Sequence, residues 1–515
     1  MNTQPFFYDV TLRDGNQALK KPWNTNEKEI IFKQLIDLGV QGIEVGFPSA
    51  SDMDFEACRY LTSIAPDNVV ISGLARTVGK DIYRAAEAIK LAPKPRIHTF
   101  VTLSPFNMEY VLKKDPLEVR KTAIEAVTYA KTLMGSKGEV QFSVEHFGDC
   151  RENLDFVIDS LKEIVKAGAS IINLPNTVER TRPMDFINMV SRVVEALTKL
   201  DKDVIIAVHC HNDLGMATAE TVESYFAGAA QLECSLNGLG ERAGNTNIYE
   251  VAVTLHNSGV NVPLDLSKIY ETALLVAEMS KVKIPEKAPL IGTDALAHRS
   301  GIHQDGAAKT KDMEKGAYRP IHPSLIGRDD EIIGFTSQSG KTAIYEIINR
   351  AGYPITMQEA VRITPAIKAA AEKIGELPTR SIIDIYFKEI FKASGPFKFI
   401  NLDKLGEETF KLRFKYENKE FEIEGEGDGP LAGCLDALAK AGFPQKLLHY
   451  EQIALDEELK GASAEAMTVI HLEDHAGNPV ICRGRDTSTA EANVKAVFNG
   501  LNILAALNKT VQIVQ

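Results

Sequence analysis

The sequence is poor in cysteine, and its cysteines follow no pairing pattern. Six cysteines are scattered over 515 residues, and no two of them form a C-x-x-C pair. This spacing argues against a disulfide framework and is typical of a protein that is kept reduced. The N-terminal residues also lack the basic region and apolar core of a secretory signal. We therefore expect a cytoplasmic protein.

Long hydrophobic runs and an excess of basic residues are missing as well. No uninterrupted apolar run reaches the ~18 residues that a membrane-spanning helix needs, and the formal net charge is -12. Nucleic acids and anionic membrane surfaces both favour basic patches, so neither is expected as a partner. A small anionic substrate stays open, because a local arginine or metal ion can bind one.

The bulk composition is that of an ordinary soluble globular protein. Hydrophobic residues make up 44% of the chain and charged residues 25%. At roughly 100–200 residues per domain, the length predicts about two to four domains.

The first half of the chain alternates between short apolar runs and amphipathic stretches of helical period. Helical stretches such as 27–38 and 153–166 end at Gly39 and Gly168, where a helix C-cap favours glycine. Repeated strand–helix units predict a parallel sheet, and eight of them predict a closed (β/α)8 TIM barrel, with a doubly wound open sheet as the alternative. The expected strands span residues 6–12, 42–47, 69–74, 96–103, 139–144, 170–174, 204–209 and 231–236.

Polar residues at the carboxyl ends of all eight expected strands favour the barrel. In such barrels this rim carries the active site. The rim residues are Arg13, Asp14, Glu44, Arg76, His98, Ser143, Glu145, Asn176, Thr177, His209, His211 and those at 237–241.

Two of these strand ends predict a metal site. Strand side chains alternate with a period of two, so His209 and His211 place both imidazoles on the same side of the chain. Asp14, at the end of the first strand, is the candidate carboxylate ligand. Imidazole suits Zn, Mn and Fe, and an added carboxylate favours harder or mixed-ligand divalent ions.

The rest of the chain divides into two regions with different predicted secondary structure. Residues 266–393 are expected to be mostly helical, with polar, glycine-containing interruptions at 297–306 and 336–341. Residues 394–515, after a linker at 393–396, alternate like strands and predict an α+β domain. Two strand-loop-helix stretches there form a weak internal repeat, and their loops at 425–430 and 484–489 offer helix N-termini to a carboxylate. We therefore expect a catalytic barrel at 1–265, helical linker subdomains at 266–393 and a regulatory domain at 394–515.

Four motifs together resemble the 2-isopropylmalate synthase family, and the resemblance covers essentially the whole chain. The motif at 44–48 favours this family over the related homocitrate synthases, citramalate synthases and hydroxymethylglutaryl-CoA lyases. The motifs are Leu12-Arg13-Asp14-Gly15-Asn16-Gln17, Glu44-Val45-Gly46-Phe47-Pro48, His209-Cys210-His211-Asn212-Asp213, and the segment 237–245.

The resemblance implies a Claisen-type condensation of acetyl-CoA with 3-methyl-2-oxobutanoate to give 2-isopropylmalate and CoA, the first committed step of leucine biosynthesis. It implies a divalent ion (Mn²⁺, Mg²⁺ or Zn²⁺) on Asp14, His209, His211 and Asn245, with K⁺ as a candidate activator. Arg13 would stabilise the developing alkoxide. The implied substrate-binding residues are Gln17, Glu44, His98, Ser143 and Thr177.

The resemblance also points to a base and to a regulator. Glu145, His303 and Tyr318 are the candidates for removing a proton from the acetyl group, and the sequence does not choose between them. Leucine is the implied effector, in a homodimer or homotetramer. The candidate residues for binding leucine are Gly427, Gly429, Asp486 and Thr487.

Two departures from the family pattern leave the keto acid open. Asn176 stands where many members have aspartate, and His146-Phe147-Gly148-Asp149 follows Glu145 in place of a more usual Asp-Ala. Citramalate synthase and homocitrate synthase are therefore the alternatives, followed by a non-catalytic leucine-binding protein. A lyase is disfavoured, because lyases of this barrel type do not usually carry the additional C-terminal domain.

Overall fold

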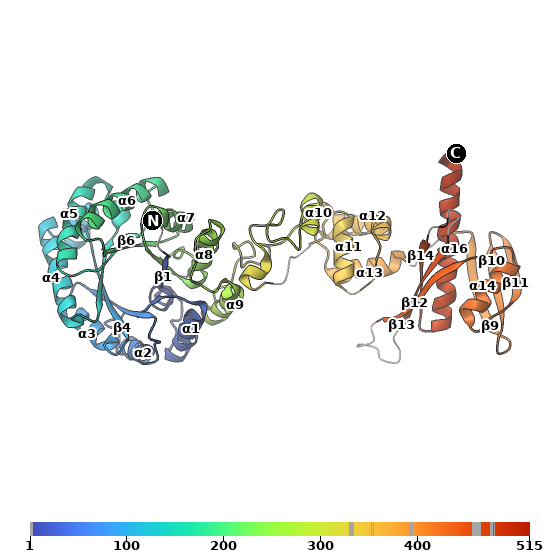
Figure 1. Cartoon of the computed structure of the whole chain (residues 1–515), viewed down its shortest axis with the longest axis horizontal. Helices are drawn as coiled ribbons and strands as arrows, with labels where there is room; N and C mark the ends of the chain where they lie inside the picture. Colours follow the sequence, from blue (N-terminus) through green and yellow to red (C-terminus); the bar gives the residue numbers. More distant parts are fainter. Residues whose placement is uncertain are drawn as a thin grey trace. The chain divides into compact units, whose positions relative to one another are not determined.

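The computed structural model describes residues 4–328, 334–351, 353, 355–390, 395–455, 465–473, 477 and 479–514. The chain forms two compact units (Figure 1). The first combines Met1–Ala297 with Met313–Ile332, and the second combines His298–Asp312 with Ile333–Gln515.

The first unit contains a closed barrel of eight strands, which confirms the predicted fold. All neighbouring strands pair in parallel, and β8 pairs with β1 through Phe6 and Gln231, so that no sheet edge remains. This closure excludes the doubly wound open sheet. The strands are β1 (Phe6–Asp9), β2 (Gly42–Gly46), β3 (Val70–Arg76), β4 (Lys94–Thr102), β5 (Glu139–Glu145), β6 (Ile171–Asn176), β7 (Ile205–Cys210) and β8 (Gln231–Cys234).

Eight helices alternate with these strands around the barrel (Figure 1). The first shows how the local sequence sets its ends: Asn24 and Glu27 form a reciprocal capping box, and Gly39 ends the helix at φ 93°, where glycine has no Cβ to clash. The helices are α1 (Thr25–Leu38), α2 (Asp52–Ser63), α3 (Gly79–Ile89), α4 (Pro116–Met134), α5 (Leu154–Lys166), α6 (Pro183–Leu200), α7 (Ala217–Phe226) and α8 (Ile248–Asn257).

The first and last strands end earlier than the sequence predicts. The Asp9 carboxylate accepts hydrogen bonds from the backbone N–H of Thr11 at 2.8 Å and from its hydroxyl at 2.9 Å. These bonds turn the chain out of β1 into a short π-helical segment, Thr11–Gly15. After β8, a 3-10 turn at Leu236–Gly238 replaces the expected end of the strand.

The expected helical stretch 266–393 contributes to both units. Its predicted end at 393, together with the first half of the linker expected at 393–396, lies outside the described residues. The helix α9 (Ile269–Ser280) belongs to the first unit. The second unit holds α10 (Gly301–Lys309), α11 (Lys341–Arg350), α12 (Met357–Ile374) and α13 (Thr379–Ile390), the last three sharing one core. The interruption predicted at 297–306 is largely wrong, because α10 begins at Gly301.

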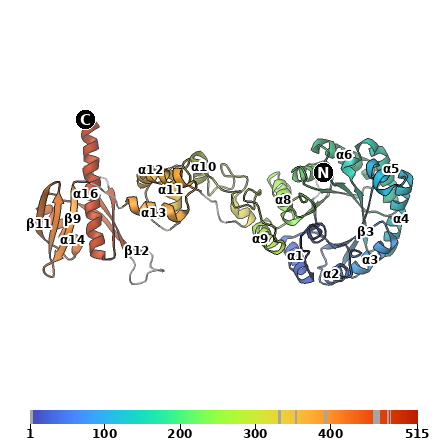
Figure 2. The ribbon, with the colours of Figure 1, turned by 180° about the vertical axis from the view of Figure 1, so that it is seen from behind.

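The C-terminal part of the second unit contains the internal repeat that the sequence predicts. Each half is a three-stranded antiparallel sheet followed by a helix, and α16 packs against strands of both sheets (Figure 2). The elements are β9 (Phe397–Lys404), β10 (Thr409–Tyr416), β11 (Lys419–Glu426), α14 (Pro430–Lys440), β12 (Leu447–Leu455), β13 (Glu465–Glu473), β14 (Pro479–Asp486) and α16 (Thr489–Val514).

All six cysteines are buried and free, as the absence of a pairing pattern predicts. Within the described residues, we find no helix with both the length and the apolar character required to span a membrane.

Candidate metal centre and active-site cavity

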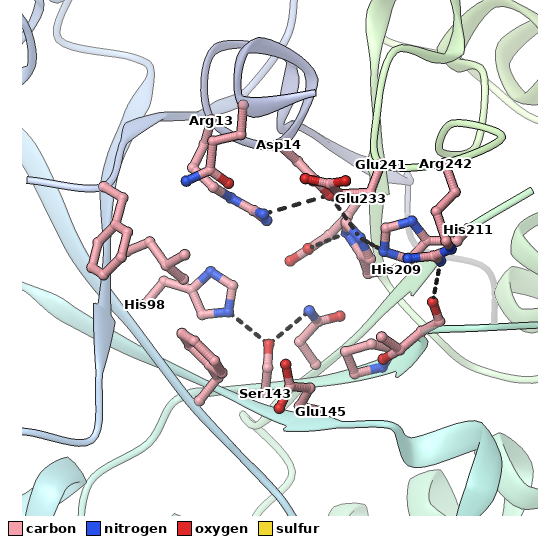
Figure 3. Close-up of a pocket in the computed structure, with 17 residues that line it drawn as sticks. Arg13, Asp14, His98, Ser143, Glu145, His209, His211, Glu233, Glu241 and Arg242 are labelled. Atoms are coloured by element: carbon pink, nitrogen blue, oxygen red, sulfur yellow. Dashed lines mark hydrogen bonds and ion pairs between the residues drawn. The ribbon is translucent and has the colours of Figure 1, made fainter. Parts of the chain in front are cut away.

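A cavity of about 350 Å³ opens at the carboxyl ends of the barrel strands (Figure 3). Every strand, or the loop that follows it, contributes at least one side chain. The lining residues are Arg13, Asp14, Gln17, Phe47, Leu74, His98, Phe100, Ser143, Glu145, Asn173, Pro175, Thr177, His209, His211, Glu233, Glu241 and Arg242. Much of the rim that the sequence predicts therefore surrounds one site, but Glu44, Arg76 and Asn176 do not line it.

Three buried side chains form a donor cluster on one wall of this cavity. One donor atom each of Asp14, His209 and His211 lies within 4.8 Å of the others. The His209 Nε2 atom is 3.4 Å from Asp14 Oδ2 and 3.3 Å from His211 Nε2. Two imidazole nitrogens that face each other beside a carboxylate match the donors of a mixed-ligand divalent site.

Asn245 adjoins the cluster from the loop after β8. Its Nδ2 donates to Asp14 Oδ2 at 3.0 Å, and its Oδ1 is buried without a hydrogen-bond partner among the described residues. A Cβ at Gly240 would lie 2.5 Å from the Asn245 amide carbon, so the glycine makes room for this amide. The orphaned oxygen supplies a fourth potential ligand, and the donor set therefore fits a metal ion.

The electrostatics of the cluster favour a positive charge among these donors. Burial raises the pKa of Asp14, but Arg13 and His209 outweigh it and hold that carboxyl well below its usual range. Burial likewise lowers the pKa of His209, but Asp14 and Glu233 raise it to about 9. Burial and the neighbouring His209 lower the pKa of His211 to about 3. The two imidazoles are thus too close to be protonated together.

A second chain of contacts fixes Arg13 and His98. The Arg13 Nε donates to Glu44 Oε2 at 2.5 Å, and His98 Nδ1 lies 2.5 Å from Glu44 Oε1. The other ring nitrogen of His98 lies 2.6 Å from Ser143 Oγ. Burial would raise the pKa of Glu44, but Arg13 and His98 lower it to about 2. Glu44 is fully buried and is not among the residues that line the cavity.

Glu145 and Thr177 lie on the side of the cavity formed by β5 and β6. Glu145 ends β5, and burial raises the pKa of its carboxyl. The Thr177 hydroxyl oxygen accepts a hydrogen bond from the backbone N–H of His146 at 2.9 Å. The backbone carbonyl of Thr177 accepts one from Arg242 Nη2 at 2.6 Å. These bonds join the loops after β5, β6 and β8.

Comparison with known proteins covers nearly the whole chain. Residues 4–276 match the HMGL-like family, residues 290–374 the homocitrate synthase post-HMGL domain-like family, and residues 376–505 the LeuA allosteric (dimerisation) domain. The 2-isopropylmalate synthase of Heliobacterium modesticaldum is 33% identical over 511 residues, which cover 98% of this chain and 97% of that protein. The chain belongs to the 2-isopropylmalate synthase family.

A second relative is closer over a shorter span. The 2-isopropylmalate synthase 2 of Leptospira interrogans is 59% identical over 372 residues, which cover 72% of this chain and 86% of that protein. Among solved structures, an HMG-CoA lyase from Brucella melitensis is similar at a TM-score of 0.45 and 20% identity, over 54% of this chain and all of that one (100%).

Besides Glu44 and Asn245, two of the three candidate bases, His303 and Tyr318, are not among the residues that line the cavity. His303 lies on α10 in the second unit. Tyr318 lies in the first unit, with a left-handed backbone at φ 62° and 53% of its surface exposed. Their participation in proton transfer stays a prediction.

Several lining residues were missed at the sequence level. Glu233 approaches His209, and the Asn173 amide donates to Ser143 Oγ at 2.9 Å. The cavity wall also has apolar side chains that were not predicted, from Leu74, Phe100 and Pro175. The sequence does contain a signal for Glu233. Gln231 and Glu233 are two polar residues with strand spacing in an otherwise apolar run, and this pattern is typical of a row of polar side chains that face the barrel interior.

The predicted regulatory residues lie in two equivalent turns of the family's C-terminal domain. Gly427 and Gly429 stand between β11 and α14, while Asp486 is the last residue of β14 and Thr487 follows it before α16. The second turn already holds a carboxylate, because Asp486 accepts the Ser488 N–H at 2.9 Å and pairs with Lys495.

Proposed function

We propose that this chain is a 2-isopropylmalate synthase, an acyltransferase that condenses acetyl-CoA with 3-methyl-2-oxobutanoate and uses water to release 2-isopropylmalate and CoA. The observation that carries the proposal is the Asp14, His209 and His211 cluster at the barrel mouth, in a chain that matches such synthases over 98% of its length.

The cluster suits the first requirement of this reaction, which is to bind and polarise a 2-keto acid. Asp14, His209, His211 and Asn245 would hold a divalent ion, with Mn²⁺ or Mg²⁺ favoured by the oxygen donors. When bound, the ion supplies Lewis acidity to the ketone under attack. Thr177 and Ser143 line the same cavity and provide hydroxyl groups for the carboxylate of the keto acid.

Arg13 meets the second requirement, which is to stabilise charge that appears on the ketone oxygen. Burial lowers its pKa, but Glu44 and Asp14 raise it above the usual value, so the guanidinium stays charged. Glu44 anchors Nε, while Nη1 lies 3.4 Å from Asp14 Oδ2, beside the proposed metal ligands. Glu44 would therefore position Arg13 and His98 rather than contact the substrate.

Glu145 is the base that the cavity itself offers for the acetyl methyl group. Its raised pKa makes the ionised carboxylate a stronger proton acceptor than an exposed glutamate. His303 and Tyr318 remain the family's other candidates for this proton transfer.

We expect the enzyme to prefer the branched five-carbon keto acid over pyruvate. Phe47, Leu74, Phe100 and Pro175 give the cavity apolar wall for an isopropyl group. One methylene in such a pocket is worth roughly 1–3 kcal/mol, so close homologues should be discriminated only modestly. The measurement is kcat/KM for free thiol released from acetyl-CoA against a panel of 2-keto acids.

The same panel distinguishes the alternatives. A highest kcat/KM with pyruvate would make the protein a citramalate synthase, and one with 2-oxoglutarate a homocitrate synthase. If no keto acid stimulated the release of thiol, the protein would be a non-catalytic leucine-binding protein. An Asp14→Ala variant, assayed in parallel, gives the background hydrolysis of the thioester.

Leucine is the proposed feedback inhibitor, bound by the C-terminal domain of a homodimer. The match to an allosteric dimerisation domain at 376–505 supports this proposal. The turn at Gly427 and Gly429 precedes α14 and can present helix N-terminal N–H groups to the leucine carboxylate.

A buried ion pair could carry the effect of leucine toward α10. Arg483 on β14 donates to both Glu359 carboxylate oxygens, at 2.9 and 3.1 Å, and so ties the second sheet to α12. The helix α12 packs on α11, and α11 packs on α10, which carries His303. Inhibition requires two conformational states of the protein that differ in affinity for leucine. We expect the two states to differ in the arrangement of β14, α12, α11 and α10.

Gly429→Asp is expected to weaken leucine inhibition and to leave kcat nearly unchanged. Nothing lies within 4 Å of a Cβ at this position, so the fold should tolerate the side chain while its charge repels the leucine carboxylate. Gly429→Asn has nearly the same shape without the charge and is the matched control. Isothermal titration with leucine on all three proteins is the measurement. An absence of binding heat in the wild type would contradict the regulatory assignment.

A further inference from the structure

We propose that Glu233 is a positioning residue that fixes which nitrogen of His209 faces the metal cluster, an assignment that rests on the proposed metal-dependent function. The two residues are direct register partners on the neighbouring strands β7 and β8. Glu233 Oε2 lies 3.1 Å from His209 Nδ1, and both side chains are buried. The opposite ring nitrogen, Nε2, faces Asp14 and His211.

The direction of each hydrogen bond can be derived from Arg96, whose guanidinium can only donate. Its Nη1 lies 3.2 Å from Gln141 Oε1 and 2.7 Å from Gln231 Oε1. Both amides must therefore present their oxygens to Arg96. Their NH₂ groups then point the other way, and both reach Glu233 Oε1, at 2.6 Å from Gln141 and 3.1 Å from Gln231.

This arrangement determines whether each remaining atom of the Glu233 and His209 pair donates or accepts a hydrogen bond. With both amides donating to Oε1, the Glu233 carboxylate acts as an acceptor, and Oε2 accepts the hydrogen on His209 Nδ1. In the neutral imidazole, the lone pair is then on Nε2, which faces the cluster, and this is the form in which imidazole binds a metal. A carboxylate behind a ligating histidine fixes both the tautomer and the ring orientation.

The hydrogen-bond network of Arg96, Gln141, Gln231 and Glu233 lies inside the barrel and reaches the end of the barrel opposite the cavity. Since β5 and β8 are not neighbours in the sheet, the contacts of Gln141 with Gln231 and Glu233 must cross the lumen. Arg96 is held by Glu139, at the start of β5, through two bonds of 2.9 and 2.7 Å. The relay therefore runs from the amino end of the barrel strands to the metal cluster.

Glu233→Gln tests the assignment, because it keeps the shape and leaves only one acceptor oxygen, which the NH₂ groups of Gln141 and Gln231 would occupy. Its amide can donate to Nδ1 and favour the tautomer that carries a hydrogen on Nε2, which opposes metal binding. We expect Mn²⁺ affinity, measured by isothermal titration, to fall by about 10–100-fold, the range for loss of such an outer partner. Glu233→Asp retains a carboxylate and should recover part of the affinity.

Glu139→Gln is the matched control. It makes the same chemical change at the amino end of the barrel, where 42% of the side chain is exposed, and Arg96 still donates to Gln141 and Gln231, which set the direction of the hydrogen bonds to Glu233. Its Mn²⁺ affinity should equal that of the wild type. Equal affinity in Glu233→Gln and wild type, with both folded, would overturn the proposal.

A measurement on the wild type keeps the test independent of how the variants fold. In Zn²⁺-loaded protein labelled with ¹⁵N-histidine, His209 should show a protonated Nδ1 and a metal-bound Nε2. Coordination through Nδ1 would overturn the positioning role. Failure of the wild type to bind Mn²⁺ or Zn²⁺ at this cluster would instead contradict the proposed function and, with it, the role assigned to Glu233.

Discussion

Arg13→Lys is expected to lower kcat by ~10²-fold or more, with little change in the KM for the keto acid, which is the signature of losing one donor to a developing oxyanion. In the structure, Glu44 binds the Nε of Arg13, and Nη1 lies beside Asp14 in the donor cluster, so the terminal nitrogens face the reaction centre. A lysine has a single ammonium, so it cannot bind Glu44 and the ketone oxygen with the same geometry.

Arg76→Lys is the matched control for this variant. Arg76 also follows from the rim pattern of the sequence, but its side chain is 60% exposed and pairs with Asp81 outside the cavity. Its steady-state parameters should match those of the wild type. A raised KM with unchanged kcat in Arg13→Lys would reassign Arg13 to ground-state binding of the keto acid.

Removal of a metal ligand should have the largest effect of all. His209→Ala and Asp14→Ala each remove one of the three clustered donors, and we expect both to lose stoichiometric Mn²⁺ binding together with turnover. His256→Ala removes an exposed imidazole on α8 and controls for the loss of a histidine. Full turnover in His209→Ala would contradict its assignment as a ligand.

The barrel could be predicted because its signals are local. Apolar runs, helical periods and C-cap glycines such as Gly39 each reflect interactions within a few residues. The pairing of His209 with His211 could be predicted for the same reason, because a strand period of two fixes their side. Asp14 joined them because barrel topology brings all strand ends to one rim.

The remaining features depend on contacts between distant residues. Asn176 fits the rim pattern, yet its amide donates to Glu220 on α7 at 2.8 Å. Gly301 and Gly306 indicate a break in the helical stretch, but α10 forms there and its Gln304 amide donates to the carbonyls of His298 and Gly334. No local pattern encodes such partners.

Chelation followed by metal replacement tests the central claim most directly. The purified protein, treated with a chelator and freed of it, should release no thiol from acetyl-CoA in the presence of 3-methyl-2-oxobutanoate, and addition of Mn²⁺ or Mg²⁺ should restore the rate. Binding of Mn²⁺ should saturate at one ion per chain at the Asp14, His209 and His211 cluster. Full activity in the metal-free protein would contradict the account.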